Sequence, residues 1–176
     1  MNDDETALVA AIRDGAPHAF NMLIDRHQQA VRAFLHRLLG NAAEADDIAQ
    51  DTFVAAWTQV RSFRGETSVR SWLCGIAWRK AKGAQRSWAR RRLRDAVHYE
   101  QMSASASTGP AIEDRLAVRQ ALLTLPLEQR AAVTLCLVSG CSHVEASAIM
   151  GVALGTVKSH VSRGRERLRR ALKEER

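Results

Sequence analysis

Residues 142–161 have the sequence SHVEASAIMGVALGTVKSHV. Ser142 and Glu145 have the spacing of a capping box, in which each side chain satisfies a free backbone amide at the start of a helix. Gly151 ends this short helix, and small residues lead into a second helix with polar and basic side chains. This order predicts a helix-turn-helix, a motif that places its second helix in the major groove of DNA.

The charge of the chain is distributed unevenly along its 176 residues, which carry a formal net charge of +7. The charged residues before Arg61 are predominantly acidic, whereas residues 79–94 contain basic residues and no acidic one. The last helix is basic as well. Such a separation predicts different partners for different surfaces, with nucleic acid the natural partner of the basic segments.

Apolar residues recur at helical spacing through most of the chain. Helices are expected at about residues 4–14, 18–39, 43–60 and 68–93, and further helices on both sides of Pro126 lead to Gly140 and the helix-turn-helix. Residues 103–110 are small and lack apolar periodicity, which favours a flexible linker. We therefore expect an all-α chain of two small helical domains, residues 1–94 and 112–176, joined by a flexible linker at residues 95–111.

The composition argues against several other classes of protein. Three cysteines (Cys74, Cys136 and Cys141) lack the spacing of a disulfide framework or a metal site, so we expect reduced thiols, no metal and no cofactor. The sequence shows no arrangement of nucleophile and base that would indicate an enzyme. No apolar run approaches the roughly 20 residues that span a bilayer, and there is no signal-peptide pattern. We expect a soluble, cytoplasmic protein that does not insert into a membrane.

Two basic helix faces are candidate nucleic-acid surfaces. In the last helix, Val157, Val161, Gly164, Leu168 and Leu172 form the face that packs, and the polar side chains opposite could reach base edges and phosphates. In the helix after Thr67, a second face combines a tryptophan with small and basic residues: Ser71, Gly75, Trp78, Arg79, Lys82 and Arg86. An aromatic among cations suits unpaired bases, which stack on it. The alternatives are a solvated amphipathic helix for the first face and a half-buried core tryptophan for the second.

A third face is acidic. Asp47, Gln50, Asp51 and Thr58 share one side of the helix at residues 43–60 with Val54, and we expect Ala49, Phe53, Trp57 and Val60 to be buried on the other side. Acidic side chains around an apolar one repel DNA but suit a basic groove on a protein. The alternative is an ordinary solvated helix face.

Three segments together resemble bacterial sigma factors of the extracytoplasmic-function (ECF) group. DDIAQDTFVAAW at residues 46–57 is similar to the segment of sigma region two that docks on core RNA polymerase. FRGET at residues 63–67 and SWLCGIA at residues 71–77 are similar to the segment that melts the promoter and recognises the minus-ten element. GTVKS at residues 155–159 resembles the start of the region four helix that reads the minus-thirty-five element. The chain departs from the family's usual residues at Arg79, Ser147, Ala153 and His160.

The resemblance implies a specificity subunit of RNA polymerase rather than an enzyme, with core polymerase, duplex and melted promoter DNA, and an anti-sigma factor (free or membrane-bound) as partners. It implies polymerase contacts by Asp46, Asp47, Gln50, Asp51 and Val54. It implies minus-ten contacts by Ser62, Phe63, Arg64, Ser71, Trp78, Arg79, Lys82 and Arg86. It implies minus-thirty-five contacts by Thr156, Lys158, Ser159, His160, Arg163 and Arg167. Two other functions stay open at this point: a stand-alone helix-turn-helix regulator and a sigma-like decoy for an anti-sigma protein.

Overall fold

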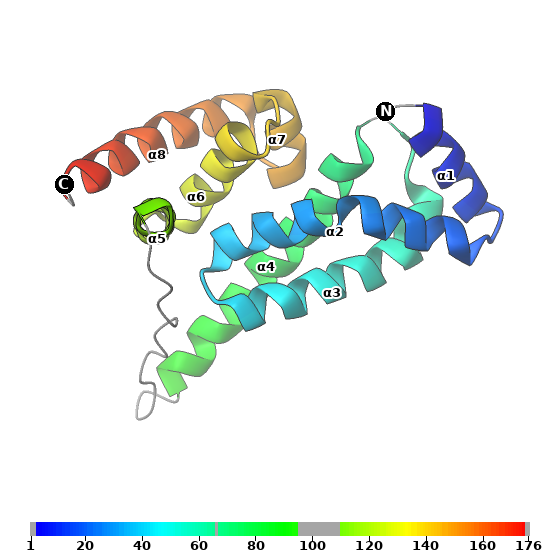
Figure 1. Cartoon of the computed structure of the whole chain (residues 1–176), viewed down its shortest axis with the longest axis horizontal. Helices are drawn as coiled ribbons and strands as arrows, with labels where there is room; N and C mark the ends of the chain where they lie inside the picture. Colours follow the sequence, from blue (N-terminus) through cyan, green and yellow to red (C-terminus); the bar gives the residue numbers. More distant parts are fainter. Residues whose placement is uncertain (1–2, 66, 95–109, 175–176) are drawn as a thin grey trace.

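The structure is a computed structural model that describes residues 3–65, 67–94 and 110–174 (Figure 1). All elements in these residues are helical, so the expected all-α fold is confirmed. In chain order the elements are α1 (Asp3–Arg13), α2 (Pro17–Leu39), α3 (Ala42–Gln59), η1 (Val60–Ser62), α4 (Val69–Arg94), α5 (Pro110–Leu123), α6 (Leu127–Val133), η2 (Thr134–Val138), α7 (His143–Met150) and α8 (Leu154–Glu174).

Helices α1 to α4 form one bundle, with α2 and α3 running side by side and α4 packed against both (Figure 1). The apolar stripe of α2 is buried in its core, including Leu23, Val31 and Leu35. Gly40 ends α2 in the left-handed conformation (φ 76°) that glycine adopts most easily, and the Asn41 side chain accepts the backbone N–H of Glu44 to start α3. The sharp corner between α2 and α3 is therefore encoded locally.

Helices α5 to α8 form the second group, and α7 and α8 make the expected helix-turn-helix. Both bonds of the capping box are present: the Glu145 N–H donates to Ser142 Oγ at 3.1 Å, and the Ser142 N–H donates to Glu145 Oε2 at 2.8 Å. Gly151 ends α7 with φ 66°. Ser147, one of the departures from the family's usual residues, donates from Oγ to the Val152 carbonyl at 2.6 Å and so helps to hold the turn.

The two groups of helices pack against each other. Helix α7 lies on α4, and buried apolar side chains from both groups form one continuous core. At a second contact, Arg130 of α6 donates from Nη1 to the Leu38 carbonyl at 2.7 Å, and Arg119 of α5 donates to the Gly40 carbonyl. Both arginines thus lie at the C-terminal end of α2, where the helix dipole favours positive charge.

The structure corrects two details of the sequence-based expectations. Trp57, expected in the core, is 44% exposed, and Phe53 is only half-buried, whereas Ala49 and Val60 are buried as predicted. Residues 95–109 of the expected linker lie outside the described residues, and the remaining two, Pro110 and Ala111, already belong to α5. Proline is favoured in the first turn of a helix because its missing N–H would have no partner there.

Across the described ranges, no helix combines the length and the apolar character needed to cross a membrane.

A glycine in α8 sets how closely that helix approaches α6. A Cβ atom on Gly164 would lie 2.5 Å from Val133 Cγ2, and a β-branched side chain has little freedom to move away. We expect Gly164→Ala to lower the free energy of unfolding by about 1–3 kcal/mol, despite the better helix propensity of alanine. Gly83→Ala in α4 is the matched control, because a Cβ atom at position 83 would meet nothing within 4 Å; it should stabilise by up to about 1 kcal/mol. Urea unfolding of the two variants measures the difference, and equal effects would contradict the close packing of α8.

Candidate functional site

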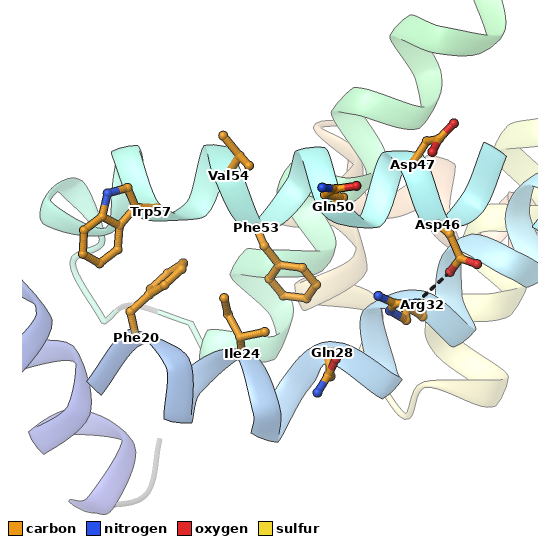
Figure 2. Close-up of a pocket in the computed structure, with 10 residues that line it drawn as sticks. All are labelled: Phe20, Ile24, Gln28, Arg32, Asp46, Asp47, Gln50, Phe53, Val54 and Trp57. Atoms are coloured by element: carbon orange, nitrogen blue, oxygen red, sulfur yellow. Dashed lines mark hydrogen bonds and ion pairs between the residues drawn. The ribbon is translucent and has the colours of Figure 1, made fainter. Parts of the chain in front are cut away.

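An open groove of about 640 Å³ runs between α2 and α3 (Figure 2). Its floor is apolar, with Phe20 and Ile24 from α2 facing Phe53 and Trp57 from α3. Its rim is polar: Gln28, Arg32, Asp46, Asp47 and Gln50. Val54 also lines the groove and is 63% exposed, so the apolar floor continues onto the surface of α3. Such a mixture of apolar floor and charged rim is typical of a protein-binding site.

Four of the five predicted polymerase-binding residues line this groove, namely Asp46, Asp47, Gln50 and Val54. Asp46 is partly neutralised, since Arg32 Nη1 lies 3.1 Å and His36 Nε2 lies 3.4 Å from its Oδ1. Asp47 is exposed at the edge. The fifth residue, Asp51, lies outside the groove lining and is 3.8 Å from Lys80 of α4. Of the carboxylates on the predicted acidic face of α3, Asp47 is therefore at the groove and Asp51 is beside it.

The aromatic part of this groove was not predicted from the sequence. Trp57 packs edge-to-face on Phe20, with ring centroids 4.8 Å apart, and both rings line the opening. The helical spacing of Phe53 and Trp57 resembles an ordinary core stripe. Which part of that stripe is covered depends on how α2 lies against α3, and a single helix pattern does not contain this information.

The predicted minus-ten face of α4 is largely covered by the helix-turn-helix. Trp78 is 2% exposed and donates from Nε1 to the Met150 carbonyl at 3.3 Å. Ser71 is 4% exposed and donates to Glu145 Oε1 at 3.3 Å. A Cβ on Gly75 would lie 4.0 Å from the Cα of Ile149. Position 75 is thus buried against the backbone of α7, at ordinary van der Waals distance.

The cationic end of the same face is more accessible. Arg79 is exposed, and Lys82 lies 5.4 Å above the Trp78 ring and 3.6 Å from Glu128 of α6. The side chain of Arg86 lies outside the described residues. The face therefore begins as a contact between domains, and of its described cations Arg79 is exposed while Lys82 still pairs with α6 across that contact.

The segment before α4 presents two of its three predicted DNA contacts to solvent. Ser62 and Arg64 are exposed. Phe63, between them, is 4% exposed and packs on Trp72 with ring centroids 5.0 Å apart. In this arrangement Phe63 anchors the segment, while its neighbours carry the polar groups.

The predicted recognition helix, α8, has the expected two faces. Val157, Val161 and Gly164 are buried against the rest of the domain. The six candidate DNA contacts are exposed or half-exposed along the other side: Thr156, Lys158, Ser159, His160, Arg163 and Arg167. The N-terminal part of the helix thus offers short polar side chains and the later part offers arginines, an arrangement suited to base edges and phosphates respectively.

The cysteines lie around the contact between α4 and α7. Burial raises the pKa of Cys74 to about 12 and that of Cys136 to about 11, and burial also raises the pKa of Cys141. A thiol with so high a pKa is a poor nucleophile and a poor metal ligand at neutral pH. Within residues 3–65, 67–94 and 110–174, no three His, Cys, Asp or Glu side chains form a cluster that could hold a metal ion.

Comparison with family models matches both halves of the chain. Residues 23–101 match sigma-70 region 2, and residues 115–168 match sigma-70 region 4. These ranges include the α4 face, the helix-turn-helix and every residue that lines the α2–α3 groove except Phe20. The class of protein that the fold and its surfaces define is therefore the sigma-70 type of transcription factor.

Individual relatives specify the group. The ECF RNA polymerase sigma factor SigM of Mycobacterium tuberculosis is 33% identical over 168 residues, which cover 96% of this chain and 84% of SigM. RNA polymerase sigma-H factor of Pseudomonas aeruginosa is 29% identical, over 97% of this chain and 94% of that protein. The chain belongs to the ECF group of RNA polymerase sigma factors.

Two solved structures have a similar fold. The sigma factor RpoE of Bartonella quintana, in complex with the anti-sigma factor NepR, aligns with a TM-score of 0.78 and 32% identity, over 89% of this chain and 98% of that chain. CnrH, in complex with the cytosolic domain of CnrY, aligns with a TM-score of 0.76 and 25% identity, over 99% of this chain and 100% of that chain.

The packing of α7 on α4 can be tested through the buried thiols. A leucine at position 75 would collide with the α7 backbone, so we expect Gly75→Leu to separate the domains and to speed thiol labelling of Cys74 and Cys141 at least about tenfold. Gly83→Leu, on the same helix but facing open space, should leave the labelling rates unchanged. Mass spectrometry of timed alkylation measures both. Equal rates in the two variants would show that Gly75 does not control the contact.

Proposed function

We propose that this protein binds core RNA polymerase and directs it to promoters, where it recognises duplex DNA upstream and captures unpaired bases as the DNA opens. The observation that carries the proposal is the coexistence, in one chain with sigma-70 regions 2 and 4, of an acidic apolar groove and two separate basic faces. The protein itself performs no covalent chemistry in this role, because the polymerase is the enzyme.

The groove between α2 and α3 is the proposed polymerase-docking site. Its aromatic floor can bury apolar side chains of a partner, and its Asp47 edge attracts basic residues while repelling DNA. An extended or helical segment of the polymerase with basic and apolar side chains would fit such a groove. Docking there leaves both basic faces outside the polymerase contact.

Helix α8 is the proposed reader of the upstream element. Thr156, Ser159 and His160 are near its start, where side chains reach base edges, and Lys158, Arg163 and Arg167 supply phosphate contacts. In the same proposal, the α4 face and residues 62–64 bind the melted strand. Opening costs roughly 1.4 kcal/mol of stacking per base-pair step, so stacking on Trp78, at about 1–3 kcal/mol per base, would offset a substantial part of it.

This role requires the two domains to separate. Trp78 and Ser71 contact α7 in the structure, so neither can contact DNA until α7 leaves α4. This domain arrangement is thus a closed state in which the strand-capturing face is covered. RpoE was solved in complex with the anti-sigma factor NepR and CnrH in complex with the cytosolic domain of CnrY, and we propose that an anti-sigma protein binds this chain and stabilises its closed arrangement. Its work on promoters would place the protein in the bacterial cytoplasm.

The docking proposal is tested by reversing charge on the acidic face of α3, at Asp47 on the groove edge and at Asp51 just outside the lining; the control carboxylates lie outside α3. We expect Asp47→Arg with Asp51→Arg to lower the affinity for core polymerase at least about a hundredfold, because two repulsive charges replace two attractive ones. Asp14→Arg with Asp25→Arg makes the same change in net charge at exposed carboxylates outside the groove lining and should keep nearly full affinity. Fluorescence titration with core polymerase measures the affinities, and run-off transcription from a genomic library measures initiation. The absence of any transcript with the wild-type protein would contradict the proposed function.

The recognition helix is tested through the salt dependence of promoter binding. Lys158→Ala and Arg163→Ala should each weaken holoenzyme binding to the upstream element and lower the slope of log affinity against log salt by about one. Lys173→Ala, near the far end of α8, is the control and should leave the slope nearly unchanged. Titration at four salt concentrations measures the slopes. If Lys158→Ala and Arg163→Ala behave like the control, α8 does not read the promoter.

A further inference from the structure

The first helix reaches the segment that precedes α4. Arg13 is in the last turn of α1, and its Nη2 donates a hydrogen bond to the carbonyl of Phe63, fifty positions later in the chain. Helix α1 also packs on η1 directly. Residues 1–22 precede the stretch that matches sigma-70 region 2, so this contact joins a helix outside the match to a segment inside it.

Phe63 is held from two other sides. Its N–H donates to the Val60 carbonyl at 3.1 Å, closing the turn of η1, and its ring packs on Trp72 of α4. With the Arg13 bond, the backbone N–H, the ring and the carbonyl of this residue are each fixed by a different element. The backbone between the exposed residues Ser62 and Arg64 is therefore fixed, and their side chains project into solvent from a fixed position.

Helix α1 is itself firmly placed, so it can act as a support. Leu8, Val9 and Ile12 are buried in the core of the bundle. At its N-terminal end, Asp4 pairs with Arg26 at 2.5 Å and Glu5 lies 3.1 Å from His27 Nε2, both on α2. The guanidinium of Arg13 is consequently presented by a rigid helix, which limits how far the Phe63 carbonyl can move.

From these contacts we propose that Arg13 is a positioning residue for the capture of unpaired promoter bases. It touches no DNA; it holds the Phe63 carbonyl so that Ser62 and Arg64 are preorganised toward the strand. This inference rests on the proposed function, in which residues 62–64 bind the melted strand. Without the bond, the segment must be ordered at the moment of binding, and that entropic cost is subtracted from the energy available for opening.

The test compares promoter opening by reconstituted holoenzymes carrying Arg13→Met, Arg13→Lys or the wild-type chain. Methionine keeps the aliphatic length and removes the donor. We expect Arg13→Met to slow opening about tenfold, which corresponds to about 1.4 kcal/mol, while core affinity and upstream duplex binding stay within about twofold of wild type. Arg13→Lys, which can still donate to the carbonyl, should restore most of the rate. Permanganate oxidation of unpaired thymines follows opening, on a promoter first found by run-off transcription.

Arg26→Ala is the matched control, because it removes the exposed ion pair between Asp4 of α1 and Arg26 of α2 but leaves the bond from Arg13 to Phe63 intact. It should open promoters at the wild-type rate. The inference would be overturned if Arg13→Met opened promoters at the wild-type rate. It would also be overturned if Arg13→Met and Arg26→Ala slowed opening equally, because only the attachment of α1 would then matter. If Arg13→Met melts below the assay temperature, Arg13→Lys decides: opening near the wild-type rate supports the inference, and opening about tenfold slower than wild type overturns it. A wild-type holoenzyme that opens no promoter would instead contradict the proposed function.

Discussion

The contact between the α7 backbone and α4 at Gly75 determines how the two domains are arranged. A Cβ atom at position 75 would already be in van der Waals contact with the Cα of Ile149, so a long side chain would not fit there, and this packing brings Met150 and Glu145 within hydrogen-bonding distance of Trp78 and Ser71. The buried indole N–H thereby gains an acceptor, and the Ser71 hydroxyl, which also accepts from Ser68, gains an acceptor for its own proton. Cys74 and Cys141 are buried at the same contact, which explains the raised pKa values of their thiols.

A second contact fixes the other end of the interface. Arg130 donates to three carbonyls, those of Leu38, Leu123 and Leu125, so one guanidinium ties the end of α2 to the turn between α5 and α6. Burial lowers the pKa of Arg130, although an arginine remains charged at neutral pH. Two of these bonds lie within its own domain and survive separation, while the bond to Leu38 is lost. If the interface opened, Arg130 would therefore keep its bonds to Leu123 and Leu125.

The helices and their ends followed from the sequence because their signals are local. Gly15, Gly40, Gly140 and Gly151 all have positive φ angles near the helix ends where they were expected, and the Ser142–Glu145 capping box forms with both bonds. The groove floor and the covered α4 face did not follow, since both depend on contacts between distant segments. Trp57 and Trp78 show this clearly: the first was expected to be buried and is exposed, and the second, for which a DNA-contacting and a core position were both left open, is buried. Their helical positions were predicted correctly, but the partner that covers each face was not encoded within the helix.

In the closed arrangement some of the proposed binding surfaces are accessible and one is covered, which constrains the order in which partners can bind. The α2–α3 groove and the exposed side of α8 are accessible while α7 covers α4, so the proposed contacts with polymerase and upstream duplex would not require the domains to separate. The strand-capturing face requires opening first, and a state populated only fractionally lowers apparent affinity by that fraction. Unpaired bases would therefore be bound weakly by the free protein. Any partner that prefers the open state, as core polymerase would if it held the two domains apart, raises the affinity for the melted strand through the same equilibrium.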